Sequence, residues 1–185
     1  MNAIETLLTR NSMAQLEDPE PTIEQIGTMV QVALRAADHG WLYPTRFISI
    51  KGENRQKLGR VFLESTKDWQ QLSEDKQQRL LNAPLRAPLI MVVVHQQQQH
   101  PKIPAQEQLL SSAASAQNLI NAAWALGLGA IWRTGDPAFT PQVAAALGLK
   151  AHEQIVGFVY IGQPKGEPKK LPELNLEDFL HEWRG

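Results

Sequence analysis

Three short polar segments carry the side chains best suited to hold an anionic ligand. They are Arg10-Asn11-Ser12, Arg35-Ala36-Ala37-Asp38-His39 and Trp132-Arg133-Thr134-Gly135. An arginine can donate two parallel charge-assisted hydrogen bonds to a phosphate, and a neighbouring hydroxyl adds a third donor. Each segment alone also fits a solvated helix end, and His39 could simply satisfy a turn carbonyl. The residue types therefore favour a phosphate-bearing ligand only if the segments act together.

The chain lacks the residues that other common catalytic, nucleotide-binding and metal sites require. The glycines at Gly127 and Gly129 fail the dinucleotide pattern G-x-G-x-x-G, because Trp132 occupies the third glycine position, and there is no Walker lysine motif. The chain has no cysteine, which excludes disulfides, thiolate metal sites and a cysteine nucleophile. Its 5 histidines are scattered, so no metal site is predicted. The serine-hydrolase nucleophile elbow is also absent from the sequence. Redox chemistry would need a borrowed cofactor.

The composition is that of one soluble domain. A chain of 185 residues, 43% hydrophobic and 20% charged, with no break in composition, predicts a single domain over residues 1–185. A net charge of -1 supplies no broad cationic field, so neither nucleic acid nor a membrane is expected as a partner. The longest apolar run, Leu89 to Val94, is too short to span a bilayer, and the N-terminus does not resemble a secretory signal. We therefore expect a cytoplasmic protein.

Hydrophobic periodicity predicts interleaved helices and strands. Helices are predicted over residues 2–9, 22–37, 105–127 and 141–148, with one or two more on the surface between 58 and 82. Strands are predicted at 46–51, 89–94, 130–132 and 155–161. The strand at 89–94 is apolar throughout, which is typical of a central strand buried on both faces. The order of elements indicates an α/β or α+β sandwich.

Motifs spread from end to end resemble the nitroreductase superfamily of flavoproteins, and most closely its minimal single-domain bacterial NAD(P)H nitroreductases. Besides the three polar segments, the resemblance is carried by Pro44, Asn82 to Ile90, Lys102-Ile103-Pro104 before Gln106-Glu107, Gly127 to Trp132, and Ile155 to Gly162. Their order and spacing match the family, although no single motif decides it. The resemblance implies an α+β fold, a nitroreductase-like three-layer α/β/α sandwich with a mostly antiparallel central sheet and a C-terminal tail that reaches the partner subunit.

The resemblance also implies FMN at the interface of a homodimer, with NADH or NADPH as the electron donor. The implied cofactor-binding residues are Arg10, Asn11, Ser12, Arg35, His39, Trp132, Arg133 and Thr134. The implied NAD(P)-binding residues are Ala122, Ala123, Trp124, Ala125, Leu126 and Gly127. Trp41 and Tyr43 would line the pocket for a small aromatic acceptor, or they are merely loop or dimer-contact aromatics. No catalytic side chain is expected, since the flavin carries the chemistry.

Two segments depart from the family pattern. Family members commonly read Arg-Arg-Ser with another basic residue shortly after, whereas this chain has Asn11 and then Met13-Ala14-Gln15, so one or two phosphate charges are missing. The flavin-side loop usually ends Gln-Pro-Trp, but here it reads Tyr43-Pro44-Thr45. The small-residue stretch Ser111 to Ala116 would form the dimer core, unless it serves ordinary helix packing.

The predicted function is that of an FMN-dependent NAD(P)H oxidoreductase. It would reduce nitroaromatic, quinone or related acceptors by ping-pong hydride transfer. One alternative is a non-catalytic flavin-binding or flavin-storage protein of the same fold, and another is a flavoenzyme of this fold with a different reaction. The sequence leaves open the preference for NADH or NADPH, and which subunit supplies Arg35 and His39.

Overall fold

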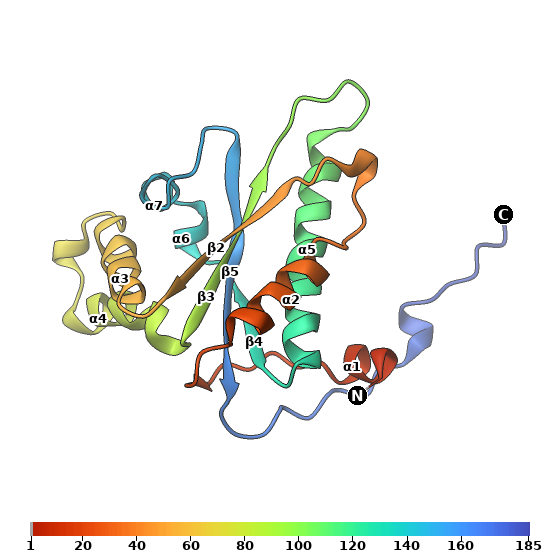
Figure 1. Ribbon diagram of the computed structural model, residues 1–185, viewed down its shortest axis with the longest axis horizontal. Helices are drawn as coiled ribbons and strands as arrows, with labels where there is room; N and C mark the ends of the chain where they lie inside the picture. Colours follow the sequence, from red (N-terminus) through yellow and green to blue (C-terminus); the bar gives the residue numbers. More distant parts are fainter. Residues whose placement is uncertain (1) are drawn as a thin grey trace.

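The computed structural model describes residues 2–185, and its centre is an antiparallel sheet with helices on both faces (Figure 1). Its five strands are β1 (Leu16–Glu17), β2 (Thr45–Lys51), β3 (Leu89–Gln96), β4 (Gly129–Arg133) and β5 (Glu153–Pro164). Four of them follow the order β1-β5-β3-β2 across the sheet. The fifth, β4, also pairs with β5, along the edge of β5 that faces away from β3. β4 is therefore an edge strand, separated from β2 by both long strands.

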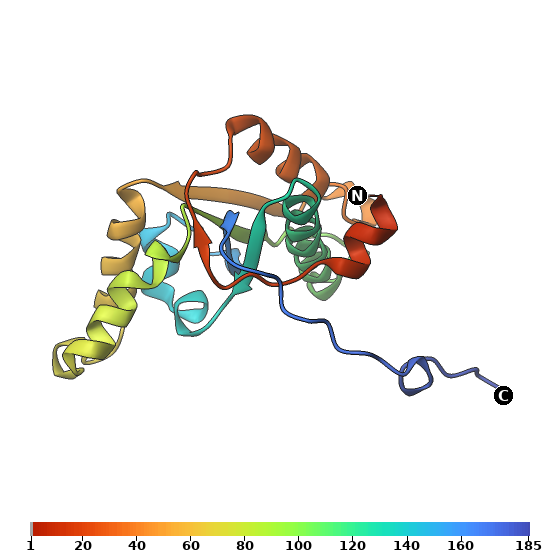
Figure 2. The ribbon, with the colours of Figure 1, turned by 90° about the horizontal axis from the view of Figure 1, so that it is seen from below.

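The helices divide between the two faces of this sheet. The α-helices are α1 (Ala3–Thr9), α2 (Ile23–Ala33), α3 (Asn54–Glu64), α4 (Glu74–Asn82), α5 (Ala105–Ala125), α6 (Asp136–Phe139) and α7 (Pro141–Ala146). Four 3-10 turns accompany them: η1 (His39–Trp41), η2 (Trp69–Gln71), η3 (Ala83–Arg86) and η4 (Leu176–Asp178). α2 and α5 cover one face, and α3, α4, α6 and α7 lie on the other (Figures 1 and 2).

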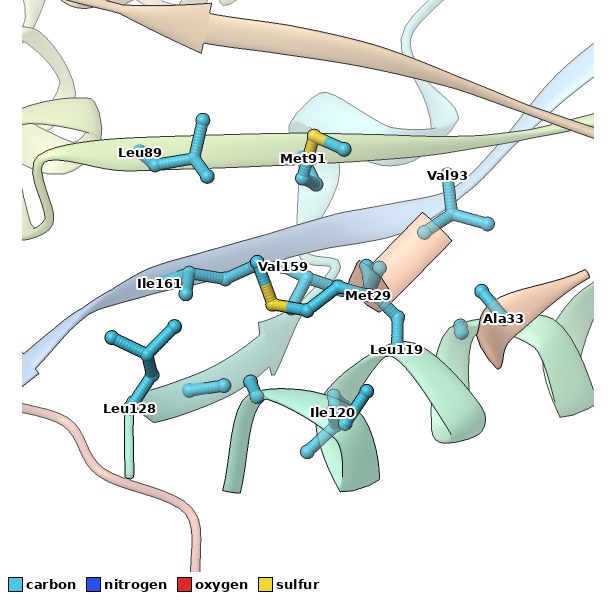
Figure 3. Close-up of a cluster of buried hydrophobic side chains, with 14 residues drawn as sticks. Met29, Ala33, Leu89, Met91, Val93, Leu119, Ile120, Leu128, Val159 and Ile161 are labelled. Carbon is cyan, nitrogen blue, oxygen red and sulfur yellow. The ribbon is translucent and has the colours of Figure 1, made fainter. Parts of the chain in front are cut away.

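Strand β3 supplies the middle of both hydrophobic cores. Because successive side chains of a strand point to opposite faces, Leu89, Met91 and Val93 pack with α2 and α5 (Figure 3). The intervening residues, Ile90, Val92 and Val94, pack against α3 and α7. Each fully buried side chain of this size contributes roughly 1.5–3 kcal/mol. The prediction of a central strand buried on both faces is confirmed.

Several boundaries differ from the prediction because local turns end the helices early. The helix expected to reach residue 37 ends at Ala33, where Arg35 N bonds Val32 O and Ala36 N bonds Ala33 O in three-residue turns. α5 ends two residues before Gly127, whose positive φ of 75° terminates it. α7 likewise stops at Ala146. The sequence reading also missed β1 and α6, which are too short to show periodicity.

The two ends of the chain present apolar side chains to the surface. After β5, the only regular element that the structure describes is the short turn η4, and Figure 2 shows this segment extending away from the sheet. Its exposed apolar residues are Leu171, Leu174, Leu176, Phe179, Leu180 and Trp183. On α1, Ile4, Leu7 and Leu8 are also exposed. Among residues 2–185, no helix combines the length and apolarity needed to cross a membrane.

Candidate cofactor site

One set of predicted residues gathers along β4, and we call it the β4 cluster: Arg10, Asn11, Ser12, Trp132, Arg133 and Thr134. Helix α1 ends at Thr9 with Arg10 as its C-cap, and Met13 N then donates a 3.0 Å hydrogen bond to Ala130 O, which docks the segment on the edge strand. Gly129 permits this approach, because a Cβ there would lie 2.5 Å from the Leu16 side chain. From Ala130 to Arg133 the strand extends about 10 Å, so the two polar segments lie along one edge.

Arg133 has an unmet hydrogen-bonding need. Its Nε is buried and finds no hydrogen-bond partner within residues 2–185, and its guanidinium lies over the Tyr160 ring, 5.5 Å from Cζ to the ring centroid. Burial raises the pKa of Tyr160, although the nearby charges of Arg133 and Arg86 act to lower it. A buried donor without an acceptor is costly, so the site fits a ligand rich in acceptor oxygens and nitrogens.

Trp132 has a positioning role in this cluster. Its Nε1 donates a 3.3 Å hydrogen bond to Val156 O, and its ring packs against the core on the α5 side. The neighbouring strand carries Gly157, where an added Cβ would lie only 1.9 Å from Trp132 Nε1. The indole is therefore engaged with the protein, and it holds the strand end that carries Arg133.

The structure brings two lysines to the β4 cluster that sequence reasoning missed. Asn11, predicted to bind the cofactor, is buried, and its Nδ2 donates a 2.6 Å hydrogen bond to Lys169 O. A second bond, from Lys165 N to Gln15 O at 3.1 Å, holds the start of the same segment. The backbone of Lys169 thus lies against the Arg10-Ser12 segment, where this chain lacks basic residues of the family pattern, and Lys170 follows it directly. The only sequence signal was the lysine pair itself.

The remaining predicted residues form a second group, the η1 cluster: Arg35, His39, Trp41 and Tyr43. His39 Nδ1 lies 2.6 Å from Glu107 Oε2 on α5, and Tyr43 N donates to Asp38 Oδ2 at 2.7 Å. Trp41 and Tyr43 have positive φ angles of 57° and 49°, which are rare for aromatic residues and often mark functional loops. With Arg35 they line a hollow of about 200 Å³.

A buried polar network holds this loop against α5. Ser112 Oγ lies 2.9 Å from His95 Nδ1 and 3.1 Å from Pro44 O, and it accepts a 3.0 Å hydrogen bond from Thr45 Oγ1. Desolvation lowers the pKa of His95, which is 2% exposed, so the imidazole is neutral at physiological pH. The serine in the small-residue stretch of α5 therefore has a specific partner, which its size alone did not reveal.

Within one chain, the two clusters lie far apart. Trp124 Nε1 donates to Thr9 Oγ1 at 3.1 Å near one end of α5, and the His39–Glu107 pair marks the other end (Figure 1). The two α5 positions are 17 residues apart (124 minus 107), which is about 26 Å along a helix. β2 and β4 are also three strand spacings apart, about 14 Å. One chain therefore does not bring Arg10 and His39 to the same ligand.

The predicted NAD(P)-binding segment lies at the C-terminal end of α5. Ala122 and Ala123 are buried in the core, and Trp124 bonds to Thr9. Only the last three residues, 125–127, are exposed. This arrangement leaves little of the segment for a ligand to contact.

The fold and clusters define an α/β/α sandwich with an arginine-bearing cluster near each end of α5. The sequence model of the Nitroreductase family matches residues 7–163, and the chain belongs to that family. The Escherichia coli (strain K12) protein named "Putative NAD(P)H nitroreductase YdjA" is 37% identical over 179 residues, 96% of each chain. The family and the three-layer, mostly antiparallel fold inferred from the motifs are thus confirmed.

Solved structures have the same fold. The nitroreductase-like family protein from Bacillus cereus superposes with a TM-score of 0.88 at 22% identity, covering 100% of this chain and 97% of the other. A variant of the FMN and NADPH-dependent nitroreductase NfnB from Sphigopyxis sp. strain HMH gives a TM-score of 0.78 at 17% identity and covers 100% of both chains.

Proposed function

We propose that this protein is an FMN-dependent NAD(P)H oxidoreductase that works as a homodimer and reduces nitroaromatic, quinone or related acceptors. The observation that carries the proposal is Arg133, whose buried Nε has no hydrogen-bond partner among residues 2–185 and lies at the strand edge on which the Arg10–Ser12 segment docks. The Escherichia coli relative is named for NAD(P)H, and NfnB is named for FMN and NADPH. An acceptor-rich cofactor such as FMN would offer a partner to this Nε, which has none among residues 2–185.

The β4 cluster would hold the cofactor through charge. Arg10, Ser12 and the adjacent Lys169 and Lys170 offer donors and positive charge for the phosphate. Arg133 would direct its Nε to the ribityl chain or the ring and oppose negative charge there. FMN held there would supply the redox chemistry that carries electrons from NADH or NADPH to the acceptor in a ping-pong cycle.

A homodimer would complete each site. In a two-fold dimer the same surface patch meets itself, so the α1 end of α5 in one protomer can approach the η1 end of its partner. The midpoint between positions 107 and 124 falls within the Ser111–Ala116 stretch, where Ala113 and Ala114 are partly exposed. Ser112, Ser115 and Ala116 instead serve the protomer's own interior. The exposed apolar residues of α1 and of the C-terminal tail give the partner a surface to bury.

The test is spectroscopic. The purified protein should be yellow, dimeric by light scattering, and bleached by NADPH under nitrogen. Arg10→Ala and Arg133→Ala should each weaken FMN binding about tenfold or more, because each removes charge-assisted hydrogen bonds worth about 1.5–3 kcal/mol. Arg60→Ala, on the exposed surface of α3, is the matched control and should retain FMN.

Two results would decide against the proposal. A colourless protein that ignores added FMN would remove the cofactor and the function together. A yellow protein that NADPH and NADH do not bleach would be a flavin-binding or storage protein, which is the alternative favoured by the unusual Tyr43-Pro44-Thr45 loop.

A further inference from the structure

Two aromatic residues of the η1 cluster have an unfavourable backbone conformation. Trp41 and Tyr43 have φ angles of 57° and 49°, and both line the hollow of about 200 Å³ that also includes Arg35. Such a conformation costs free energy and persists only where surrounding contacts hold it. Trp41 is 74% exposed and Tyr43 is 53% exposed, so burial of their own side chains does not hold them. The backbone beside them must be held by neighbouring segments.

One such segment is the connection between β3 and α5, which we call the glutamine loop (residues 97–104). It lies at the same end of α5 as η1 (Figure 1). Gln98 Nε2 donates a hydrogen bond to Leu42 O, the carbonyl between the two aromatic residues. The buried Ile103 side chain packs against Gly40, where an added Cβ would lie 2.6 Å from Ile103 Cδ1. The glutamine loop therefore holds the backbone on both sides of the first aromatic residue.

A buried side chain of α5 fixes the glutamine loop in turn. Gln108 is 2% exposed, and its Oε1 accepts a 2.9 Å hydrogen bond from Gln98 N. Its Nε2 donates to Gln98 O at 3.0 Å and to Ile103 O at 3.3 Å. A polar group in the interior is costly unless it is hydrogen-bonded, and this amide meets its need entirely on the backbone of one loop. Gln108 thereby places the Gln98 side chain beside Leu42.

The next turn of α5 holds the other end of the aromatic segment. Ser112 follows Gln108 by four residues, so the two side chains lie on the same face of the helix. Ser112 Oγ lies 3.1 Å from Pro44 O and accepts a 3.0 Å hydrogen bond from Thr45 Oγ1. One face of α5 thus fixes both ends of the segment that carries the two aromatic residues.

From these contacts we infer that Gln98 and Gln108 are positioning residues that determine which acceptors the η1 hollow admits. They act through the backbone, by keeping Trp41 and Tyr43 in the conformation in which both line the hollow. The inference rests on the proposed function for its role in turnover. The positioning itself rests on contacts within one chain, so it can be measured without turnover.

The test uses Gln98→Glu, which keeps the shape of the side chain but removes the donor to Leu42 O. Gln99→Glu is the matched control, because it makes the same charge change at the adjacent exposed position, whose side chain has no hydrogen bond among residues 2–185. In the FMN-loaded protein, kcat/KM for menadione, a flat two-ring quinone, should fall about fivefold in Gln98→Glu, since one lost hydrogen bond shifts an equilibrium by about that factor. Ferricyanide takes electrons without stacking on aromatic rings, so its kcat/KM should differ less than twofold between the two variants.

Amide hydrogen exchange of the purified full-length protein gives a readout independent of turnover. The amides of Trp41 and Tyr43 donate to Asp38, to its backbone O and to its Oδ2. Peptides covering residues 38–45 should therefore exchange about fivefold faster in Gln98→Glu than in the wild type or in Gln99→Glu, and peptides of β3 should not change. Gln108→Leu should act in the same direction, because it releases the whole glutamine loop.

Three results would overturn the inference: unchanged exchange in Gln98→Glu, equal losses with menadione and ferricyanide, or equal effects in Gln99→Glu. Faster exchange in a protein that oxidises neither NADPH nor NADH would instead remove the proposed function and the acceptor role. The positioning of the aromatic segment by Gln98 would then be retained.

Discussion

Mixed dimers should rebuild a cofactor site that neither of two damaged variants has alone. Arg10 lies at the α1 end of α5 and Arg35 belongs to the η1 cluster at the other end, about 26 Å away along the helix. If each FMN site takes one cluster from each protomer, Arg10→Ala damages one half of every site. Arg35→Ala then damages the other half.

The size of the recovery follows from the two-fold symmetry. A mixed dimer holds one site with both substitutions and one site with neither. Random assortment makes half of the dimers mixed, so about one quarter of all sites should be intact. Each substitution alone should weaken FMN binding roughly tenfold or more, because a charge-assisted hydrogen bond contributes about 1.5–3 kcal/mol. At an FMN concentration near the wild-type Kd, the parent variants should therefore stay nearly empty.

The assay is an FMN titration of co-expressed, differently tagged variants purified through both tags. The isolated mixed dimer should bind one FMN with wild-type affinity. The matched control pairs Arg10→Ala with Arg133→Ala, because both residues lie in the β4 cluster and each site of that mixed dimer keeps one damaged residue. The reasoning is refuted if the Arg10/Arg35 dimer binds no better than its parents, or if the control dimer recovers equally.

Three further outcomes follow from single contacts. Arg46 lowers the pKa of Glu153 from 4.5 to about 2, which corresponds to a stabilisation of at most about 3 kcal/mol before solvent screening. Glu153→Gln should therefore lower Tm by about 5 °C or more at pH 7. Since the pKa is depressed, this stabilisation is present above pH 4.5 and is lost as the pH falls toward 2. His95→Asn should reduce the loss of stability below pH 6.5 in urea titrations, because burial lowers the pKa of His95 and the unfolded chain takes up its proton first. Gly157→Ala should weaken FMN binding in a titration, because its Cβ would displace Trp132.

Two of these variants have a matched control, and all three have a contradicting outcome. His152→Asn, at an exposed position, should keep the acid sensitivity of the wild type, and Gly27→Ala, whose Cβ would meet nothing within 4 Å, should keep FMN affinity. An unchanged Tm for Glu153→Gln at pH 7 would show that the pair with Arg46 contributes nothing. Persistent acid sensitivity in His95→Asn, or full FMN affinity in Gly157→Ala, would contradict the other two.

The sequence by itself was sufficient where the signal is local or repeated. The three-to-four-residue spacing of apolar positions predicted α5, and the unbroken apolar run predicted β3, because a helix or strand imposes its own period on the residues it buries. The order of the polar motifs was sufficient to predict the family and its three-layer fold. Element ends were less predictable, since two short turns around Ala33 end α2 while the apolar spacing continues.

Only the tertiary structure decided how the site is divided. The bond from Asn11 to Lys169 joins residues 158 positions apart, and no local pattern could show that the C-terminal segment brings its lysines to Arg10. The unmet Nε of Arg133 depends on Tyr160 of a neighbouring strand. Arg10 and His39 are widely separated because they lie near opposite ends of α5. Such contacts are set by the packing of distant elements, because their free energy comes from burial and complementarity in three dimensions and leaves no period along the chain.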